Sequence, residues 1–190
     1  MKNHTTIIAE VGLNHNGSVE IGKRLVDAAK ISGADYVKFQ MRDLKSLYRN
    51  PDNYYNESLA TQYTLDLLHK YDLSFDELIE LFNYAKKEGI EPLCTPWDTH
   101  SVSVLEAYGI SAYKTASADL TNIELLECIA QTNKLMFCST GMSTEGEIIK
   151  ACRLLDKMNA NYKLMHCNST YPAPYKDIQL KYIERLRVIS

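Results

Sequence analysis

Several features that mark large classes of protein are missing from this sequence. No run approaches the roughly 18 apolar residues that a membrane-spanning helix needs, and the first residues are too polar for a signal peptide. The five cysteines show no C-x-x-C spacing, so neither a zinc site nor a disulfide framework is expected. The formal net charge is −3 and the basic residues are scattered, which argues against a nucleic-acid partner. We expect a cytoplasmic protein without nucleic-acid or membrane partners.

Short motifs for nucleotide binding and serine catalysis are also missing. The glycine-rich patterns G-x-G-x-x-G and G-x-x-x-x-G-K-[ST], which bind dinucleotides and nucleoside triphosphates, do not occur. Neither does G-x-S-x-G, the pattern around the serine nucleophile of α/β-hydrolases. Cys94 and Cys167 follow apolar segments and are candidate nucleophiles, but the sequence pairs no base with either of them.

Six apolar segments have the composition of buried strands, and each of them is followed by polar residues. Each segment runs into charged, hydroxyl or amide side chains that apolar packing does not require. These polar clusters are residues 10–17, 38–40, 95–98, 114–119, 139–142 and 166–172. In a barrel of parallel strands the carboxyl ends meet at one rim, where (β/α) enzymes hold their catalytic groups. The repetition therefore predicts both a fold and the position of a site.

Amphipathic segments alternate with these strands and carry helix start and stop signals. Ser74 and Thr144 each precede a glutamate by three residues, which makes a capping box, and Gly33 and Gly89 end two helical patterns. A last helical pattern is expected to begin near Asp177. The alternation predicts a parallel sheet closed as a TIM-type (β/α)8 barrel. An open doubly wound sheet is the alternative, but it would gather its polar residues at one switch point.

The number of repeats falls short of a full barrel. Six strand–helix units are present, whereas a complete barrel has eight strands and about 250 residues. We expect residues 1–190 to form the N-terminal part of such a barrel, incomplete by itself. The connection over residues 42–72 is long, polar and rich in tyrosine, with a helix expected from about Leu59 to Tyr71. Long loops in compact domains are usually functional, so we expect a partly ordered cover over the barrel mouth.

Two lysines are the strongest indication of a ligand. Lys38 and Gln40 are two apart on one segment and therefore point to the same side, while Phe39 points to the other. Lys114 repeats the pattern on another segment. An internal ion pair, for instance with Glu10, would explain a lysine in such apolar surroundings. Two lysines at one mouth with few acids favour instead a substrate that carries more than one negative charge.

Hydroxyl side chains follow several of the strands. Ser117, Ser139, Thr140 and Ser169 lie at strand ends or just past them, where hydroxyls and free backbone N–H groups suit phosphate oxygens. Singly, each would be an ordinary cap or turn residue. Their convergence on one rim is what indicates an anion site.

Two carboxylates and two histidines also lie at the predicted rim. Glu10 and Asp119 could act as acid and base or hold sugar hydroxyls, although Asp119 could equally be a helix-entry residue. His15 lies in a polar loop and is interpreted as a substrate contact. His166 is interpreted as a hydrogen-bonded core histidine rather than a metal ligand, since a metal needs several convergent ligands.

Taken together, the strand-end motifs resemble those of the sialic acid synthase family, which makes N-acetylneuraminic, legionaminic and pseudaminic acids. The motifs, in order along the chain, are IAEVGLNHNG (8–17), KFQ (38–40), TPWD (95–98), KTASAD (114–119), STGMST (139–144) and HCNSTYPAP (166–174). The resemblance implies a (β/α) barrel followed by a small antifreeze-like C-terminal domain that this chain does not contain. It also implies that the full-length form is a homodimer.

The resemblance implies roles for individual residues. By this match, phosphoenolpyruvate is bound by Lys38, Thr95, Lys114, Ser117 and Ser169, and the amino-sugar is bound by Glu10, Gln40 and Tyr171. Glu10 and Asp119 are the implied catalytic carboxylates. Asp119 stands where some family members have glutamate, and Ser169 where some have asparagine.

The implied reaction condenses phosphoenolpyruvate with an N-acylated hexosamine aldehyde, such as N-acetylmannosamine, to a nonulosonic acid and phosphate. The resemblance implies a divalent metal, Mn²⁺ or similar, whose ligands are expected beyond residue 190, so none is assigned within this chain. The alternative is a truncated barrel fragment that is catalytically inactive and at most binds anions.

Overall fold

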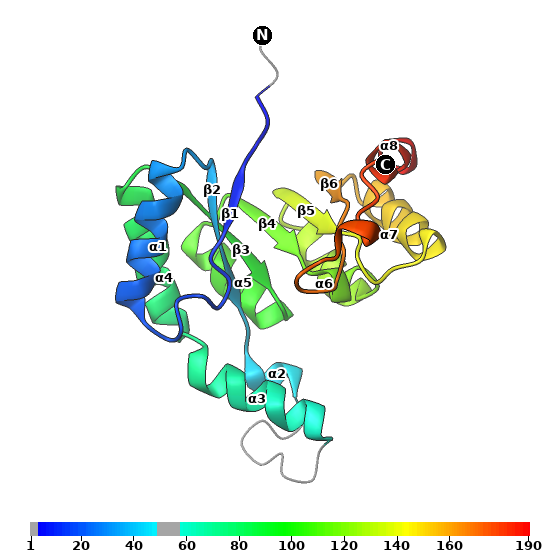
Figure 1. Ribbon diagram of the computed structural model, residues 1–190. Coiled ribbons are helices and arrows are strands. Elements are labelled where there is room, and N and C mark those ends of the chain that lie inside the picture. The colour runs from blue at the N-terminus through cyan, green and yellow to red at the C-terminus, as the bar shows by residue number, and fades with distance from the viewer. Residues whose placement is uncertain (1–3, 49–57) are drawn as a thin grey trace.

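The computed structural model describes residues 4–48 and 58–190 and contains a single curved sheet of six parallel strands (Figure 1). The strands are β1 (Ile8–Glu10), β2 (Tyr36–Met41), β3 (Glu91–Pro96), β4 (Ala112–Thr115), β5 (Leu135–Ser139) and β6 (Tyr162–Met165). They lie in sequence order, β1-β2-β3-β4-β5-β6. A doubly wound sheet would reverse this order at a switch point, so the structure confirms the barrel-type fold as a curled half-barrel.

Helices alternate with the strands, and most of them cover the outer face of the curl. They are α1 (Val19–Ile31), α2 (Leu44–Leu47), α3 (Leu59–Tyr71), α4 (Phe75–Lys87), α5 (Thr99–Tyr108), α6 (Ile123–Ala130), α7 (Glu145–Lys157) and α8 (Tyr182–Ile189). Short 3-10 turns lie at η1 (Ser117–Asp119) and η2 (Tyr175–Asp177). Figure 1 shows α1 and α4 side by side on one flank, with α7 and α8 on the other.

The helix boundaries follow local chemistry. Ser74 and Thr144 form the expected capping boxes at the starts of α4 and α7. The last helix begins at Tyr182, not near Asp177 as the sequence indicated, because η2 ends in extended backbone at Ile178. Arg185 of α8 then pairs with Glu145 of α7 at 2.5 Å, which holds the last helix to the previous one.

The outer face of the sheet forms the main hydrophobic core with the helices. It is built from alternate strand residues, among them Val37, Phe39, Cys94, Tyr113 and Met136, all buried. Phe39 packs edge-on against Phe82 of α4, with ring centroids 5.6 Å apart. This face is apolar along the strands except at the carboxyl end of β4, where it carries the buried Thr115.

The inner face of the curl changes character along the strands. Near the amino ends it carries a small apolar cluster of Leu93, Ala112 and Phe137, with Ile8, Tyr36, Leu135 and Met165 packed around it. Side chains on one face of a strand recur every second residue. The inward position two residues after the apolar cluster is therefore the next one on each strand, and there the inner face becomes polar. The next inward positions are Glu10, Lys38, Thr95, Lys114, Ser139 and Cys167. Strand periodicity thus brings the polar groups to the carboxyl end of the half-barrel.

The long connection after β2 lies beyond the carboxyl ends of the strands, where Figure 1 places α2 and α3. None of its described residues, 42–48 and 58–72, lines the cavity at the strand ends. The expected cover is therefore not found in this part, and residues 49–57 lie outside the described chain. In the described ranges, no helix is both long enough and apolar enough to cross a lipid bilayer.

Candidate active site

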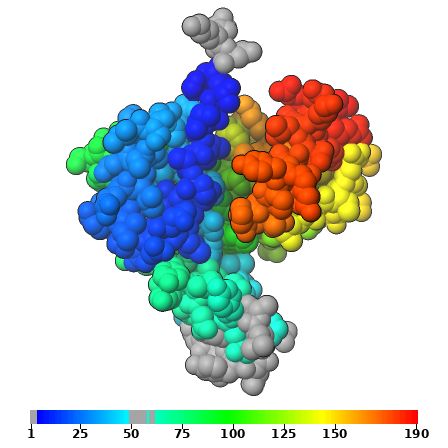
Figure 2. Space-filling view, in the orientation of Figure 1, coloured from blue at the N-terminus to red at the C-terminus, as the bar shows by residue number. Residues whose placement is uncertain are grey.

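A cavity of about 500 Å³ lies at the carboxyl ends of the strands. All six strands, or the loops that follow them, contribute to its wall. In the space-filling view, the N-terminal residues and the segment after β6 stand on either side of a hollow (Figure 2). Every predicted substrate-binding residue lines this cavity: Glu10, Lys38, Gln40, Thr95, Lys114, Ser117, Ser169 and Tyr171.

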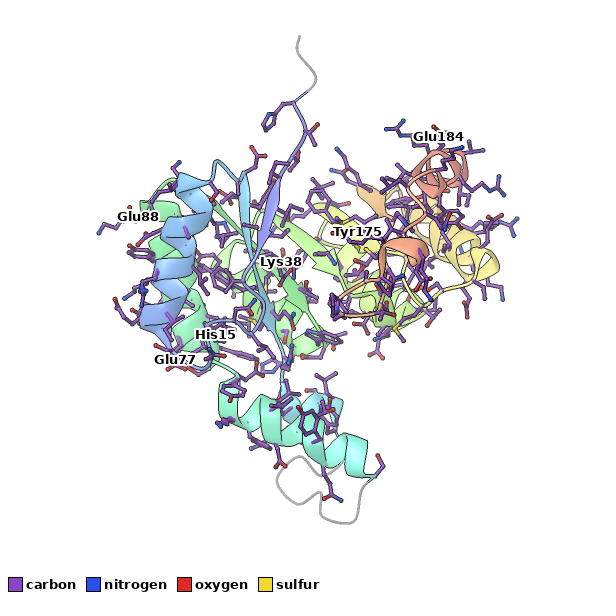
Figure 3. The ribbon with its side chains drawn as sticks, in the orientation of Figure 1. His15, Lys38, Glu77, Glu88, Tyr175 and Glu184 are labelled. Carbon is purple, nitrogen blue, oxygen red and sulfur yellow. The ribbon has the colours of Figure 1, made fainter. Side chains whose placement is uncertain are left out.

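Lys38 forms a buried ion pair in this wall. Its side chain is only 5% exposed, and its Nζ lies 2.6 Å from Oε2 of Glu10, whose side chain is 49% exposed. The same Nζ donates to the Thr95 hydroxyl at 3.3 Å. Figure 3 shows Lys38 near the middle of the sheet. The expected internal ion pair with Glu10 is thus confirmed, and both residues line the cavity, whereas the anionic ligand of Lys38 stays a prediction.

Lys114 is the second cation of the cavity. Its Nζ donates to the Ser139 hydroxyl at 2.5 Å, and no carboxylate of residues 4–48 or 58–190 lies within ion-pair distance. Burial lowers the pKa of Lys114, and the positive charge of Lys38 lowers it further. An anion between the two lysines would relieve both effects. The pair is therefore suited to a ligand with more than one negative charge.

Gly141 allows two hydroxyls of the cavity wall to approach each other. A methyl group on Gly141 would lie 2.5 Å from Oγ of Ser169 and 2.7 Å from Oγ of Ser117, so only glycine allows this approach. Ser117 and Ser169 belong to the loops after β4 and β6, and Gly141 follows β5 between them. Thr140 does not join this group, because its hydroxyl is used by the carbonyl of Met165 at 2.8 Å.

Gln40 is held in one orientation beside Glu10. Its Oε1 accepts hydrogen bonds from Trp97 Nε1 at 3.3 Å and from the guanidinium of Arg42. A methyl group on Gly12 would lie 3.5 Å from Gln40 Nε2 and 2.8 Å from Glu10 Oε1. The amide nitrogen and the free carboxylate oxygen thus lie together on the cavity wall next to Gly12.

Asp119 and Tyr171 differ from the other predicted site residues. Asp119 lies in η1, and its neighbours Ser117 and Ala118 line the cavity although it does not. Burial raises the pKa of Asp119, and its Oδ2 is buried without a hydrogen-bond partner among the described residues. Tyr171 lines the cavity at its edge and is 91% exposed. The catalytic role of Asp119 stays a prediction.

The interpretation of His15 was wrong, and that of His166 was right only in part. His15 is buried, and its Nδ1 accepts the backbone N–H of Gly17 at 3.1 Å, so the ring closes a turn rather than facing a substrate. Figure 3 shows it beside Glu77 at the start of α4, apart from Lys38. His166 is hydrogen-bonded as expected, since its Nε2 accepts the backbone N–H of Gln179 at 3.3 Å, but it is only partly buried and not a core residue. The local sequence did not indicate the burial of either ring, because burial is decided by packing between distant elements.

Cys94 cannot act as a nucleophile. It is fully buried on the outer face of β3, and burial raises the pKa of its thiol to about 12. Cys167 does line the cavity. The sequence reasoning overlooked Trp97 and Arg42. Arg42 follows Gln40 by two residues, as Gln40 follows Lys38, and this spacing could have indicated that all three lie on one side.

The described residues do not form a metal site. No group of three or more His, Cys, Asp or Glu side chains in residues 4–48 and 58–190 is placed to hold an ion. Among the described residues, Glu10 is the only carboxylate on the cavity wall, and it is already paired with Lys38. A divalent metal therefore does not fit the donors of the described chain, and no chemical step is derived through it.

Comparison with known proteins finds relatives that match almost the whole chain. The protein MJ1065 of Methanocaldococcus jannaschii is 42% identical over 186 residues, which cover 97% of this chain and 52% of that protein. The N,N'-diacetyllegionaminic acid synthase of Campylobacter jejuni is 38% identical over 190 residues, which cover 96% of this chain and 57% of that enzyme. The chain thus spans about half the length of these relatives.

Solved structures give the same result. The N-acetylneuraminic acid (sialic acid) synthetase of Leptospira borgpetersenii superimposes with a TM-score of 0.88 at 29% identity, over 99% of this chain and 62% of that one. A model of the NeuB family matches residues 25–189. The resemblance to sialic acid synthases is confirmed: the chain belongs to the NeuB family.

Proposed function

We propose that this chain provides the phosphoenolpyruvate and sugar-binding part of an enzyme that makes a nonulosonic acid. The observation that carries the proposal is the pair of cations, Lys38 and Lys114, facing one cavity with the hydroxyls of Thr95, Ser117 and Ser139 around them. Phosphoenolpyruvate carries a carboxylate and a phosphate. Its two anionic groups match two lysines better than a ligand with one charge would.

The reaction would form one carbon–carbon bond and release one phosphate. The CH2 carbon of phosphoenolpyruvate attacks the aldehyde carbon of the open-chain sugar, and the aldehyde oxygen becomes a hydroxyl by taking a proton. The cation left at C2 takes up water, which loses a proton, and phosphate leaves by cleavage of the C–O bond. The net equation is phosphoenolpyruvate plus aldehyde plus water giving nonulosonic acid plus phosphate.

The residues of this chain would bind and orient the reactants. The lysines and the serine hydroxyls would hold the two anionic groups, and Glu10 and Gln40 would contact the sugar. Asp119 would take the proton from water if the loop at η1 turns its carboxylate toward the cavity. Burial raises the pKa of Asp119 above its ordinary value, which favours proton exchange by this carboxyl group.

The sugar is proposed to be an N-acylated hexosamine. The name of the Campylobacter jejuni relative supports a diacetamido sugar of the legionaminic type, with N-acetylmannosamine as the second candidate. A cytoplasmic location, a homodimeric full-length form and a divalent metal such as Mn²⁺ are further parts of the proposal. The metal ligands would come from outside the described residues, so residues 1–190 alone are expected to bind phosphoenolpyruvate without turnover.

Calorimetric titration of the chain with phosphoenolpyruvate tests the binding part. Phosphoenolpyruvate should bind about tenfold more tightly than either pyruvate or inorganic phosphate, because only it meets both lysines. Equal affinity for all three would contradict the proposal. Phosphate release is then measured with Mn²⁺ and each candidate sugar. Turnover by residues 1–190 would contradict the expected inactivity of this part of the enzyme and leave the binding result unaffected.

A further inference from the structure

Arg42 is a buried cation just behind the cavity wall. Its side chain is 6% exposed, and its Nη1 lies 3.8 Å from Oδ1 of Asp72, which directly follows α3. Its Cζ lies 5.1 Å from the ring centroid of Trp97, a distance that allows a cation–π contact. The other end of the guanidinium donates through Nη2 to Oε1 of Gln40. The side chains of Arg42, Asp72, Trp97 and Gln40 thus form one cluster.

The cluster decides which way the Gln40 amide faces. The guanidinium of Arg42 and the indole N–H of Trp97 can only donate hydrogen bonds. Both point at the same atom of Gln40, so that atom must be the carbonyl oxygen. The NH2 group is consequently left on the cavity side, near Gly12 and Oε1 of Glu10. The opposite orientation is unfavourable, because the NH2 group of Gln40 would then face the guanidinium of Arg42 and the indole N–H of Trp97, which are also donors.

We propose that Arg42 is a positioning residue that holds the Gln40 amide with its NH2 group toward the cavity, so that this wall selects a hydrogen-bond acceptor on the sugar. The recognised group is a hydroxyl or carbonyl oxygen of the sugar. That the ligand is a sugar rests on the proposed function, whereas the orientation of the Gln40 amide does not.

A purely structural role for Arg42 is the alternative. In that case the residue would only anchor the connection between β2 and α4 through Asp72. The contacts favour positioning instead, because the distance to Asp72 is long for an ion pair and the closer contact is with Gln40. Trp97, against which the guanidinium lies, is itself part of the cavity wall. The long connection after β2 thus supports the cavity from behind through Asp72 and Arg42.

Side-chain amide resonances of the ligand-free chain test the orientation directly. The NH2 pair of Gln40 is assigned by its disappearance in Gln40→Glu, and the indole N–H belongs to Trp97, since the chain has one tryptophan. In Arg42→Met the Gln40 pair should move and broaden, because one of two donors that hold the oxygen is gone. Arg153→Met, an exposed arginine on α7, is the control and should leave the pair unchanged.

Arg42→Lys separates positioning from ion pairing. A lysine keeps a charge opposite Asp72, but it cannot also lie flat on Trp97 and donate to Gln40. Positioning predicts that Arg42→Lys perturbs the Gln40 pair as Arg42→Met does, and the structural role predicts a wild-type spectrum. An unperturbed Gln40 pair in the lysine variant would overturn the proposal. If the methionine variant does not fold, the lysine variant carries the same comparison.

Titration with two probes tests the selection. N-acetylmannosamine should shift the Gln40 pair in the wild type and bind about tenfold more weakly to Arg42→Lys, while phosphoenolpyruvate binds both proteins equally. An equal loss of affinity for both probes in Arg42→Lys would indicate general damage and overturn the selective role. If the sugar does not shift the Gln40 resonances, recognition of the sugar by Gln40 is overturned. Failure of phosphoenolpyruvate to bind the wild type would contradict the proposed function alone, since the amide orientation is measured without ligand.

Discussion

The Nζ of Lys38 lies 2.6 Å from Oε2 of Glu10, and the two residues are also register partners on neighbouring parallel strands. The lysine is almost fully enclosed, whereas the carboxylate reaches the cavity. One carboxylate therefore neutralises the buried cation and still offers its second oxygen, Oε1, to a ligand. Lys114, by contrast, is bonded to the neutral Ser139 hydroxyl, so its charge is the less compensated of the two.

Replacing Lys114 with methionine should remove most of the anion affinity. A charge-assisted hydrogen bond contributes about 1.5–3 kcal/mol, so phosphoenolpyruvate should bind roughly ten- to a hundredfold more weakly. The free energy of unfolding should not fall, because burial disfavours the charged form of this lysine. Calorimetric titration and urea denaturation measure the two quantities. Lys87→Met, at an exposed position on α4, is the control, and an equal loss of affinity there would contradict the assignment.

The Glu10→Gln variant should separate stability from anion binding. It leaves Lys38 enclosed without its carboxylate, which should cost about 1 kcal/mol, less than for a fully buried pair because Glu10 is half exposed. The uncompensated lysine should then bind phosphoenolpyruvate more tightly, since an anion replaces the lost charge. Thermal melting with and without the ligand measures both effects. A larger ligand-induced rise of Tm in the variant is expected, and a smaller one would show that Glu10 does not compete with the anion.

Two glycine-to-alanine changes test the close approach at Gly141. Gly141→Ala would put a methyl group 2.5 Å from Oγ of Ser169 and 2.7 Å from Oγ of Ser117, so both hydroxyls must move. We expect phosphoenolpyruvate to bind about tenfold more weakly to this variant. Gly146→Ala is the matched control, because nothing lies within 4 Å of the added methyl group. It lies in α7 and should stabilise the chain by up to about 1 kcal/mol. Equal binding by the two variants would contradict a role for the Gly141 contact.

His15 should make the stability depend on pH. Burial lowers the pKa of His15 below its ordinary value of 6.5, so the ring stays neutral in the folded chain where the unfolded chain has already bound a proton. Because the unfolded state binds more protons below pH 6.5, stability should fall on acidification and recover above this value.

His15→Gln should remove that dependence. Melting of both proteins from about pH 5 to about pH 8 isolates it, because the two chains differ only at position 15. The variant should also lose about 1 kcal/mol at neutral pH if glutamine does not restore the hydrogen bond from Gly17. Parallel pH profiles for the two proteins would show that His15 carries no such effect.

The strand-end pattern was sufficient to place most of the candidate site. Lys38 and Gln40 recur with the period of a strand, and Lys114 repeats the pattern, so their convergence follows from parallel strands alone. His15 and His166 could not be assigned in this way. Their exposure depends on how the loops pack against α4 and against η2 and α8, which are contacts between segments far apart in the chain.

The parallel half-barrel follows from the amino-acid pattern, because alternating strands and capped helices allow few other arrangements. The same pattern places two lysines and several hydroxyls at one rim. How these groups are paired became visible only in the folded chain. The fold puts Glu10 on Lys38, Ser139 on Lys114, and Arg42 behind Gln40. The physical reason is that strand periodicity determines the side to which a residue points, whereas hydrogen bonds and ion pairs depend on strand register and on distances of a few ångströms.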